Sequence, residues 1–342
     1  MNRTFRPAGI RALAIELPSR YRTITLPNGD SAMRHALSDG LTGLDLDRAA
    51  AEEALRAAKL DPSEIDLVLG ASFPALPEPC IGNATPMAWD MGMERAAAWN
   101  VESACASGLV ALRSACQEVM VGEYDNVLVV VGCPYSHTVE PGHPATDVIG
   151  DAAFAMVIGP TAEGQELLGS VVRNSGPTCS LVSWSVDLAV PSGIRLAVGH
   201  KTAGQLEEWA LKQLPELVAE LFSRAGVSVA DVDHWVCNAP TPRFVDRAIS
   251  VMGGDPEHGV NTNRLVGNVG PALIGVSLYY NAILRDFQPG DLVACCSVGS
   301  EASLALSLMR WPENVALGKE PATGTVEQMR AFEAERFAVA VG

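Results

Sequence analysis

One cysteine stands among small residues in the stretch Val101-Glu102-Ser103-Ala104-Cys105-Ala106-Ser107-Gly108-Leu109. After it, apolar side chains recur at helical spacing, whereas residues 97–101 have the pattern of the end of a short buried strand. The helical positions are Leu109, Leu112, Cys116, Val119 and Met120. We therefore expect Cys105 at an elbow between a strand and a helix.

A cysteine at such an elbow is suited to nucleophilic catalysis. The first turn of a helix presents unpaired backbone amides and the positive end of the helix dipole. Both favour thiolate over thiol, which predicts a reactive Cys105 near neutral pH. The neighbours Ala104, Ala106 and Gly108 leave room for an acyl group. An ordinary buried cysteine is the alternative that this stretch leaves open.

The composition indicates an enzyme-sized, acidic protein. The 342 residues are 48% hydrophobic, enough for one large core or two fused ones. The formal net charge of −16 argues against nucleic acid or an anionic membrane as a partner. It also argues mildly against a broad basic face for an acidic carrier protein.

The cysteines and the N-terminus bear on localisation. The eight cysteines show neither a CxxC pair nor the spacing of a zinc site, so we expect reduced thiols and no bound metal. Residues 1–7 lack the apolar core of a signal peptide, and no apolar run has membrane-spanning length. We expect a soluble, cytoplasmic protein.

The second half of the chain repeats the plan of the first. Each half has the pattern of an amphipathic helix, an acidic turn and a buried strand, at 44–71 and at 209–236. Each then has a further helix, a polar turn and an all-apolar strand, at 105–132 and 268–297. An all-apolar strand must be covered on both faces. The pattern predicts an α/β fold of two duplicated βαβα halves, packed in five α/β/α/β/α layers.

Three segments follow from this plan. Residues 1–160 form the N-terminal half with the nucleophile, 161–311 the C-terminal half, and 312–342 an extension with an exposed or dimer-covering helix over 325–337. Residues 18–41, rich in Gly, Asp and Asn, predict a loop or short helix. By the internal symmetry, Asn268 starts the helix that matches the one at Cys105, so both residues should meet near the centre.

Four short motifs resemble those of the thiolase superfamily, and within it the ketoacyl-ACP synthase III-like (KAS III-like) condensing enzymes. They are Ala104-Cys105-Ala106-Ser107-Gly108, Gly150-Asp151-Ala152-Ala153, Gly267-Asn268 and Val298-Gly299-Ser300. Each is common by itself. Their order and intervals, together with the internal duplication, extend the resemblance over residues 9–311.

The resemblance implies acyl chemistry on thioesters. The cysteine, here Cys105, takes an acyl group from acyl-CoA or from the phosphopantetheine of an acyl carrier protein, with no permanently bound cofactor. The backbone amides of Cys105 and near Gly299 would form the oxyanion hole. Arg243 matches an arginine at the pocket mouth that contacts substrate phosphates. The family's adenine-binding tryptophan has no counterpart over 22–41, so donor recognition stays open.

The chain departs from the family at the catalytic histidine. The corresponding residue is Asn238, so the family's Cys-His-Asn set becomes Cys105, Asn238 and Asn268. An amide donates a hydrogen bond to a carbonyl but accepts no proton from a thiol. Ordinary decarboxylative elongation is therefore not expected.

Glu78 is the replacement base that the resemblance suggests. In the related head-to-head condensing enzyme of the olefin pathway, a glutamate within about one residue of this position reaches the neighbouring subunit's active site. The alternative, a solvated loop carboxylate, stays open.

Two functions remain. The first is an acyltransferase or non-decarboxylative condensing enzyme of polyketide- or fatty-acid-like secondary metabolism, such as antibiotic biosynthesis. The second is a non-catalytic or half-catalytic partner subunit of a KAS III-like heterodimer. The resemblance also implies a homodimer that pairs beside residues 97–101 and places loop 74–83 at the interface.

Overall fold

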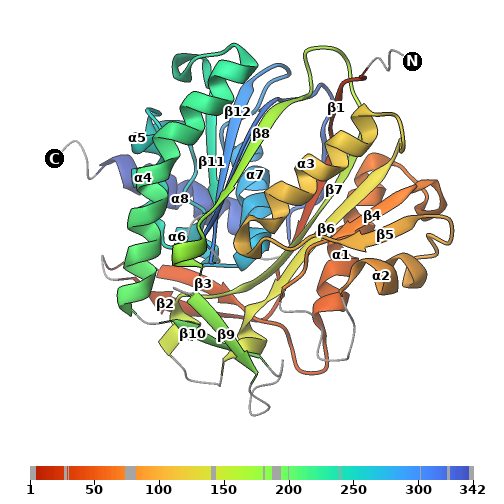
Figure 1. The fold of residues 1–342 in the computed structure, drawn as a ribbon. Coiled ribbons are helices and arrows are strands. Elements are labelled where there is room, and N and C mark those ends of the chain that lie inside the picture. The colour runs from red at the N-terminus through yellow and green to blue at the C-terminus, as the bar shows by residue number, and fades with distance from the viewer. Residues whose placement is uncertain are drawn as a thin grey trace.

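Two β-sheets carry the fold of the computed structural model, which describes residues 5–26, 29, 31–73, 82–139, 144–179, 182–186, 194–198, 200–238, 240–300, 302–321 and 324–338 (Figure 1). The strands of the first sheet are β1 (Ala8–Glu16), β4 (Leu67–Gly70), β5 (Ala97–Asn100), β6 (Val127–Pro134), β7 (Asp151–Pro160) and β14 (Ala316–Leu317). Those of the second are β8 (Leu167–Asn174), β11 (His234–Asn238), β12 (Leu292–Gly299) and β13 (Ser303–Arg310).

The two sheets share one topology. The first has the order β14-β1-β7-β6-β4-β5 and the second β11-β12-β13-β8. The series β1-β7-β6-β4 and β8-β13-β12-β11 both contain two antiparallel pairings followed by a parallel one. The predicted duplication is therefore confirmed.

The main helices form the layers around the sheets (Figure 1). Between the sheets lie α3 (Ser107–Met120) and α7 (Leu273–Leu284), which contact strands of both sheets. The outer face of the first sheet is covered by α1 (Gly43–Ala58) and α2 (Ala84–Asp90), and that of the second by α4 (His200–Ala225) and α5 (Pro242–Val251). This is the predicted five-layer arrangement. All residues of β6 are buried because helices cover both of its faces.

The central helices approach each other and the first sheet closely at two glycines. A Cβ on Gly108 of α3 would lie 2.7 Å from Cγ2 of Ile274, and one on Gly275 of α7 would lie 2.0 Å from Cγ of Phe154. Glycine is unfavourable inside a helix, so its presence here reflects the need for close packing. This packing brings together the N-terminal ends of α3 and α7, where Cys105 and Asn268 lie.

The remaining elements lie at the edges of this core. Two hairpins pair β2 (Tyr21–Thr25) with β3 (Ser31–His35) and β9 (Val182–Val186) with β10 (Ile194–Val198). The prediction of a loop or short helix over 18–41 is wrong for β2 and β3. Neither strand alternates between buried and exposed residues, because β2 is largely exposed and β3 is buried after its first residue, so the sequence carried no strand pattern. Single 3₁₀ turns occur at Pro62–Glu64, Ala104–Ala106, Tyr135–Thr138, Pro144–Asp147, Gly176–Thr178, Val229–Asp231, Pro256–His258 and Gly270–Ala272.

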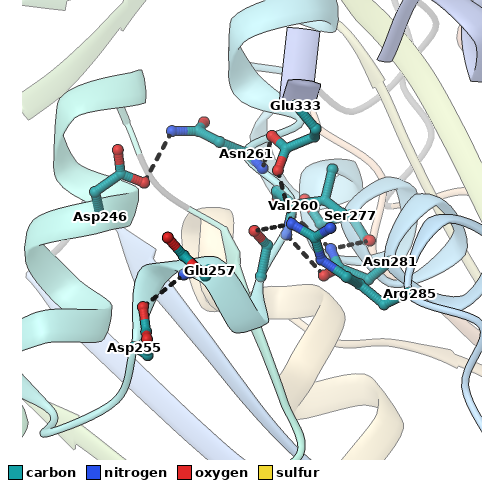
Figure 2. A network of polar contacts seen from close by, with 10 residues as sticks. Asp246, Asp255, Glu257, Val260, Asn261, Ser277, Asn281, Arg285 and Glu333 are labelled. Carbon is teal, nitrogen blue, oxygen red and sulfur yellow. Dashed lines mark hydrogen bonds and ion pairs between the residues drawn. The ribbon is translucent and has the colours of Figure 1, made fainter. Parts of the chain in front are cut away.

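The C-terminal extension packs onto the body through β14 and α8 (Thr325–Ala338). Here β14 pairs with β1, and α8 contacts α7 and the short α6 (Asn263–Val266). Figure 2 shows the carboxylate of Glu333 between Arg285 and Asn261, at 2.9 Å from Arg285 Nη2 and 3.2 Å from the Asn261 amide nitrogen.

The predicted helix over 325–337 is therefore confirmed, but it is exposed on one face only. Val326, Met329 and Phe332 are buried together with Glu333. A charged residue that finds a buried partner cannot be recognised from sequence pattern. In the described part of the chain, no helix combines the length and apolarity needed to cross a membrane.

Candidate active site

The cysteine elbow follows strand β5. The amide of Val101 still donates to the carbonyl of Gly70, and a 3₁₀ turn at Ala104–Ala106 then leads into α3. Ala104 has a φ of +47°, in the left-handed region that side chains disfavour. Its amide donates to Oε1 of Glu102, and its carbonyl accepts from Oγ of Ser107, both at 2.7 Å. The predicted elbow is confirmed, and local hydrogen bonds hold its strained backbone. The prediction that the strand before it is buried is wrong, because β5 is the edge of the sheet and is partly exposed.

Cys105 lies at a small cavity of about 80 Å³. Its side chain is 9% exposed, and Sγ lies 3.7 Å from the hydroxyl of Tyr135. The other residues around the cavity are Phe73, Glu102, Ala104, Pro271 and Ser300. Sequence reasoning missed Tyr135, which is distant in the chain. It also missed Glu102, whose place next to the cysteine motif was a usable signal.

The cavity changes the expected ionisation of Cys105. Burial raises the pKa of the thiol above its ordinary value, and the Glu102 carboxylate adds to that shift. The Tyr135 hydroxyl and the backbone amides of Ser300 and Cys105 act in the opposite direction but do not outweigh burial. The predicted low pKa is therefore wrong, because desolvation of the anion exceeds the benefit of the helix end.

Gly299 lets β12 approach the elbow. A Cβ on Gly299 would lie 2.8 Å from the carbonyl oxygen of Ser103 and 2.2 Å from Oγ of Ser303. The hydroxyl of Ser303 donates to that Ser103 carbonyl at 3.0 Å. The amide that reaches Sγ of Cys105 belongs to Ser300, the residue after Gly299. Two backbone amides thus face the sulfur, one from each half of the chain.

Asn238 lies beneath the elbow at the end of β11. Its side chain is 1% exposed, and Nδ2 donates to the carbonyl of Cys105 at 2.8 Å and to that of Gly270 at 3.0 Å. Both N–H bonds of this amide are directed at backbone carbonyls. In this geometry Asn238 joins the start of α3 to the start of α7.

Asn268 precedes α7, as the internal symmetry predicts. Its backbone forms a bridge with Ile149, and its Oδ1 accepts from the amide of Gly270 at 2.9 Å. Neither Asn268 nor Asn238 is among the described residues that line the Cys105 cavity.

The Gly150-Asp151 motif holds the segment that carries Tyr135. The buried carboxylate of Asp151 accepts from the amide of Leu37 at 2.8 Å and from the amide and hydroxyl of Ser136 at 2.7 and 2.5 Å. It therefore fixes the residue directly after Tyr135 to strand β7. This motif acts on the site through structure rather than through contact with the sulfur.

Glu78 lies outside the described residues, but both sides of its loop are described. Ser72 and Asn83 both donate to Oδ2 of Asp47, at 2.6 and 2.7 Å. Burial raises the pKa of Asp47 to about 7.

Arg243 is exposed on the first turn of α5 and does not line the Cys105 cavity.

Two family models match the chain at the segments that build this site. Residues 99–176 match 3-oxoacyl-[acyl-carrier-protein (ACP)] synthase III, and residues 222–311 match 3-oxoacyl-[acyl-carrier-protein (ACP)] synthase III C terminal. The first segment contains Cys105 and Tyr135, and the second contains Asn238, Asn268 and Gly299. The chain belongs to the KAS III-like superfamily.

Full-length relatives agree with this assignment. A β-ketoacyl-[acyl-carrier-protein] synthase III of Symbiobacterium thermophilum is 29% identical over 328 residues, 90% of this chain and 98% of the relative. One from Thermosynechococcus vestitus is 28% identical over 81% of this chain and 86% of the relative. The chain is thus a relative of KAS III condensing enzymes.

Solved structures of this superfamily share the fold. The 3-oxoacyl-(acyl carrier protein) synthase III FabH of Pseudomonas aeruginosa superposes with a TM-score of 0.78 at 23% identity, covering 90% of this chain and 99% of that one. The priming β-ketosynthase of the R1128 polyketide pathway has a TM-score of 0.77 at 21% identity over 92% and 99%. OleA of Xanthomonas campestris has a TM-score of 0.78 at 18% identity over 90% and 97%.

The raised pKa of Cys105 predicts how the rate of its alkylation depends on pH. Because the thiolate is the nucleophile, alkylation of Cys105 by iodoacetamide should be slow at pH 7 and accelerate about tenfold per pH unit up to pH 9. Peptide mass spectrometry resolves this adduct from that on the exposed Cys179, which serves as the internal control. If Cys105 reacts as fast as Cys179 at pH 7, burial does not dominate its ionisation.

Proposed function

We propose that this chain is an acyltransferase or non-decarboxylative condensing enzyme that carries its acyl group on Cys105. The supporting observation is the cavity in which Sγ faces the amides of Cys105 and Ser300. Such amides stabilise the oxyanion of a thioester under attack. The donor would be an acyl-CoA or an acyl carrier protein, the substrate class that the names of the relatives indicate.

Asn238 is the reason for excluding decarboxylation from this proposal. Decarboxylation of a malonyl thioester leaves an enolate that needs a strong donor at the position of the family's histidine. The Asn238 amide instead donates to the Cys105 and Gly270 carbonyls. It also accepts no proton from an acceptor nucleophile. Acyl transfer to a nucleophile that another group activates fits this site better.

Two carboxylates are candidates for that activation. Glu102 lines the cavity in the described structure, whereas Glu78 is suggested by the resemblance to the olefin-pathway enzyme. We propose that one of them accepts the proton of the attacking nucleophile. We also propose a role in secondary metabolism of the polyketide or fatty-acid-like kind, in the cytoplasm. The alternative is a partner subunit in which Cys105 is never acylated.

The first test is covalent acylation. Incubation with a panel of acyl-CoA and acyl-carrier thioesters should add one acyl mass to Cys105, and Cys105→Ala should abolish it. Malonyl thioesters should lose CO₂ at near-background rates. Cys116→Ala, at a buried cysteine within α3, is the matched control. Absence of any adduct would favour the partner-subunit function, and efficient decarboxylation would refute the exclusion of that reaction.

The second test separates the two carboxylates. If Glu102 is the proton acceptor, Glu102→Gln should slow the second half-reaction by about 10²-fold or more, so that acyl-enzyme accumulates. Glu78→Gln should then turn over normally. The reverse result assigns the role to Glu78. Normal turnover in both variants would show that the acceptor loses its proton without either of them.

The third test concerns assembly. Strand β5 is the edge of the first sheet, and its Trp99 is 38% exposed, so we propose a homodimer that pairs there beside loop 74–83. Sedimentation at micromolar concentration should show a dimer that Trp99→Glu weakens. Val251→Glu, at a residue 39% exposed on α5, is the control. A monomeric native protein would contradict the homodimer.

A further inference from the structure

Tyr135 forms the wall of the cavity next to the sulfur of Cys105. It is the first residue after β6, its side chain is 4% exposed, and its Oη lies 3.7 Å from Sγ. None of the four motifs on which the resemblance was based contains this residue. Its hydroxyl is the side-chain group that the described structure places against the nucleophile.

Several contacts fix the phenol ring in this position. The hydroxyl of Thr138 donates to the carbonyl of Tyr135 at 2.7 Å, and the ring of Phe73 packs edge-on with centroids 6.2 Å apart. A Cβ on Gly270 would lie 3.0 Å from Cζ and 3.1 Å from Oη of Tyr135. Gly270, with a φ of +54°, therefore leaves the space that the phenol occupies.

Tyr135 and Asn238 both contact Cys105 and Gly270, but Asn238 contacts their backbone and Tyr135 contacts the sulfur of Cys105. The Asn238 amide donates to the backbone carbonyls of Cys105 and Gly270, whereas the Tyr135 hydroxyl packs against Gly270 and reaches the sulfur. Burial raises the pKa of Tyr135 well above its ordinary value, and the nearby Cys105 and Cys133 thiols add to this. The phenol therefore keeps its proton at neutral pH, and its chemistry is that of a donor.

We propose that Tyr135 is a catalytic residue that donates a hydrogen bond to the sulfur of Cys105 and stabilises its anionic form. This inference deepens the proposed function and rests on it for the acyl-transfer step. In the first half-reaction the Sγ–acyl bond forms, the thioester bond of the donor breaks, and the thiol proton of Cys105 passes to the departing thiolate. In the second, the acceptor takes the acyl group, and its proton passes by way of the proposed carboxylate to Sγ as the Sγ–acyl bond breaks. Tyr135 keeps its own proton throughout.

The test is the pH profile of Cys105 alkylation by iodoacetamide, which needs no acyl donor. Tyr135→Phe removes the hydroxyl and keeps the ring, so the profile should shift upward by about one pH unit, with alkylation about tenfold slower at pH 7. Acylation by a reactive thioester should slow by a similar factor. Tyr279→Phe is the matched control, because that buried hydroxyl donates to the carbonyl of Gly318 at 3.0 Å.

A second substitution covers the case in which Tyr135→Phe fails to fold. Replacing Tyr135 alone by 3-fluorotyrosine keeps its shape and strengthens the donor, so the alkylation profile should shift downward. An unchanged profile in a folded Tyr135→Phe protein, or the same shift in Tyr279→Phe, would overturn the proposal. A shifted profile in a protein that accepts no acyl group supports the contact with sulfur and refutes the proposed function separately.

Discussion

The side-chain amide of Asn238 joins the two halves of this molecule at the point where their central helices begin. Its two N–H bonds bind the carbonyl of Cys105, before α3, and that of Gly270, before α7. The donors are buried, so leaving either one unpaired would be unfavourable. Close approach of α3 and α7 is possible because Gly108 and Gly275 carry no side chain where Ile274 and Phe154 lie. The position of the cysteine elbow depends on both features.

The site illustrates a competition between burial and local hydrogen bonding. The elbow directs backbone amides at Sγ of Cys105, an arrangement that stabilises an anion. The thiol itself is buried at a small cavity, so desolvation raises its pKa despite these donors. A site of this kind disfavours free thiolate, and under the proposed function it would favour a transition state in which charge moves from sulfur to the carbonyl oxygen. This is the property that acyl transfer from a thioester requires.

Asn238, the residue that the resemblance aligns with the family's histidine, is not among the described residues that line the cavity. An imidazole would present one polar nitrogen to the substrate, whereas the Asn238 amide is directed at the backbone below. The polar residues that line the cavity beside Cys105, among those described, are Tyr135 at the end of β6, Glu102 at the elbow, and Ser300 after β12.

The sequence by itself determined the duplicated α/β halves, the elbow at Cys105, and the place of Asn268 just before the matching helix of the second half. Each of these follows from periodicity, from internal repetition or from a local motif, which are properties of neighbouring residues. Only the tertiary structure decided that Ser300 supplies the second amide, that Tyr135 reaches the sulfur, and that Glu333 buries one face of α8. Those contacts join residues far apart in the chain, so no local sequence pattern predicts them. The pKa of Cys105 likewise depended on desolvation, which is set by everything packed around the thiol rather than by the helix end beside it.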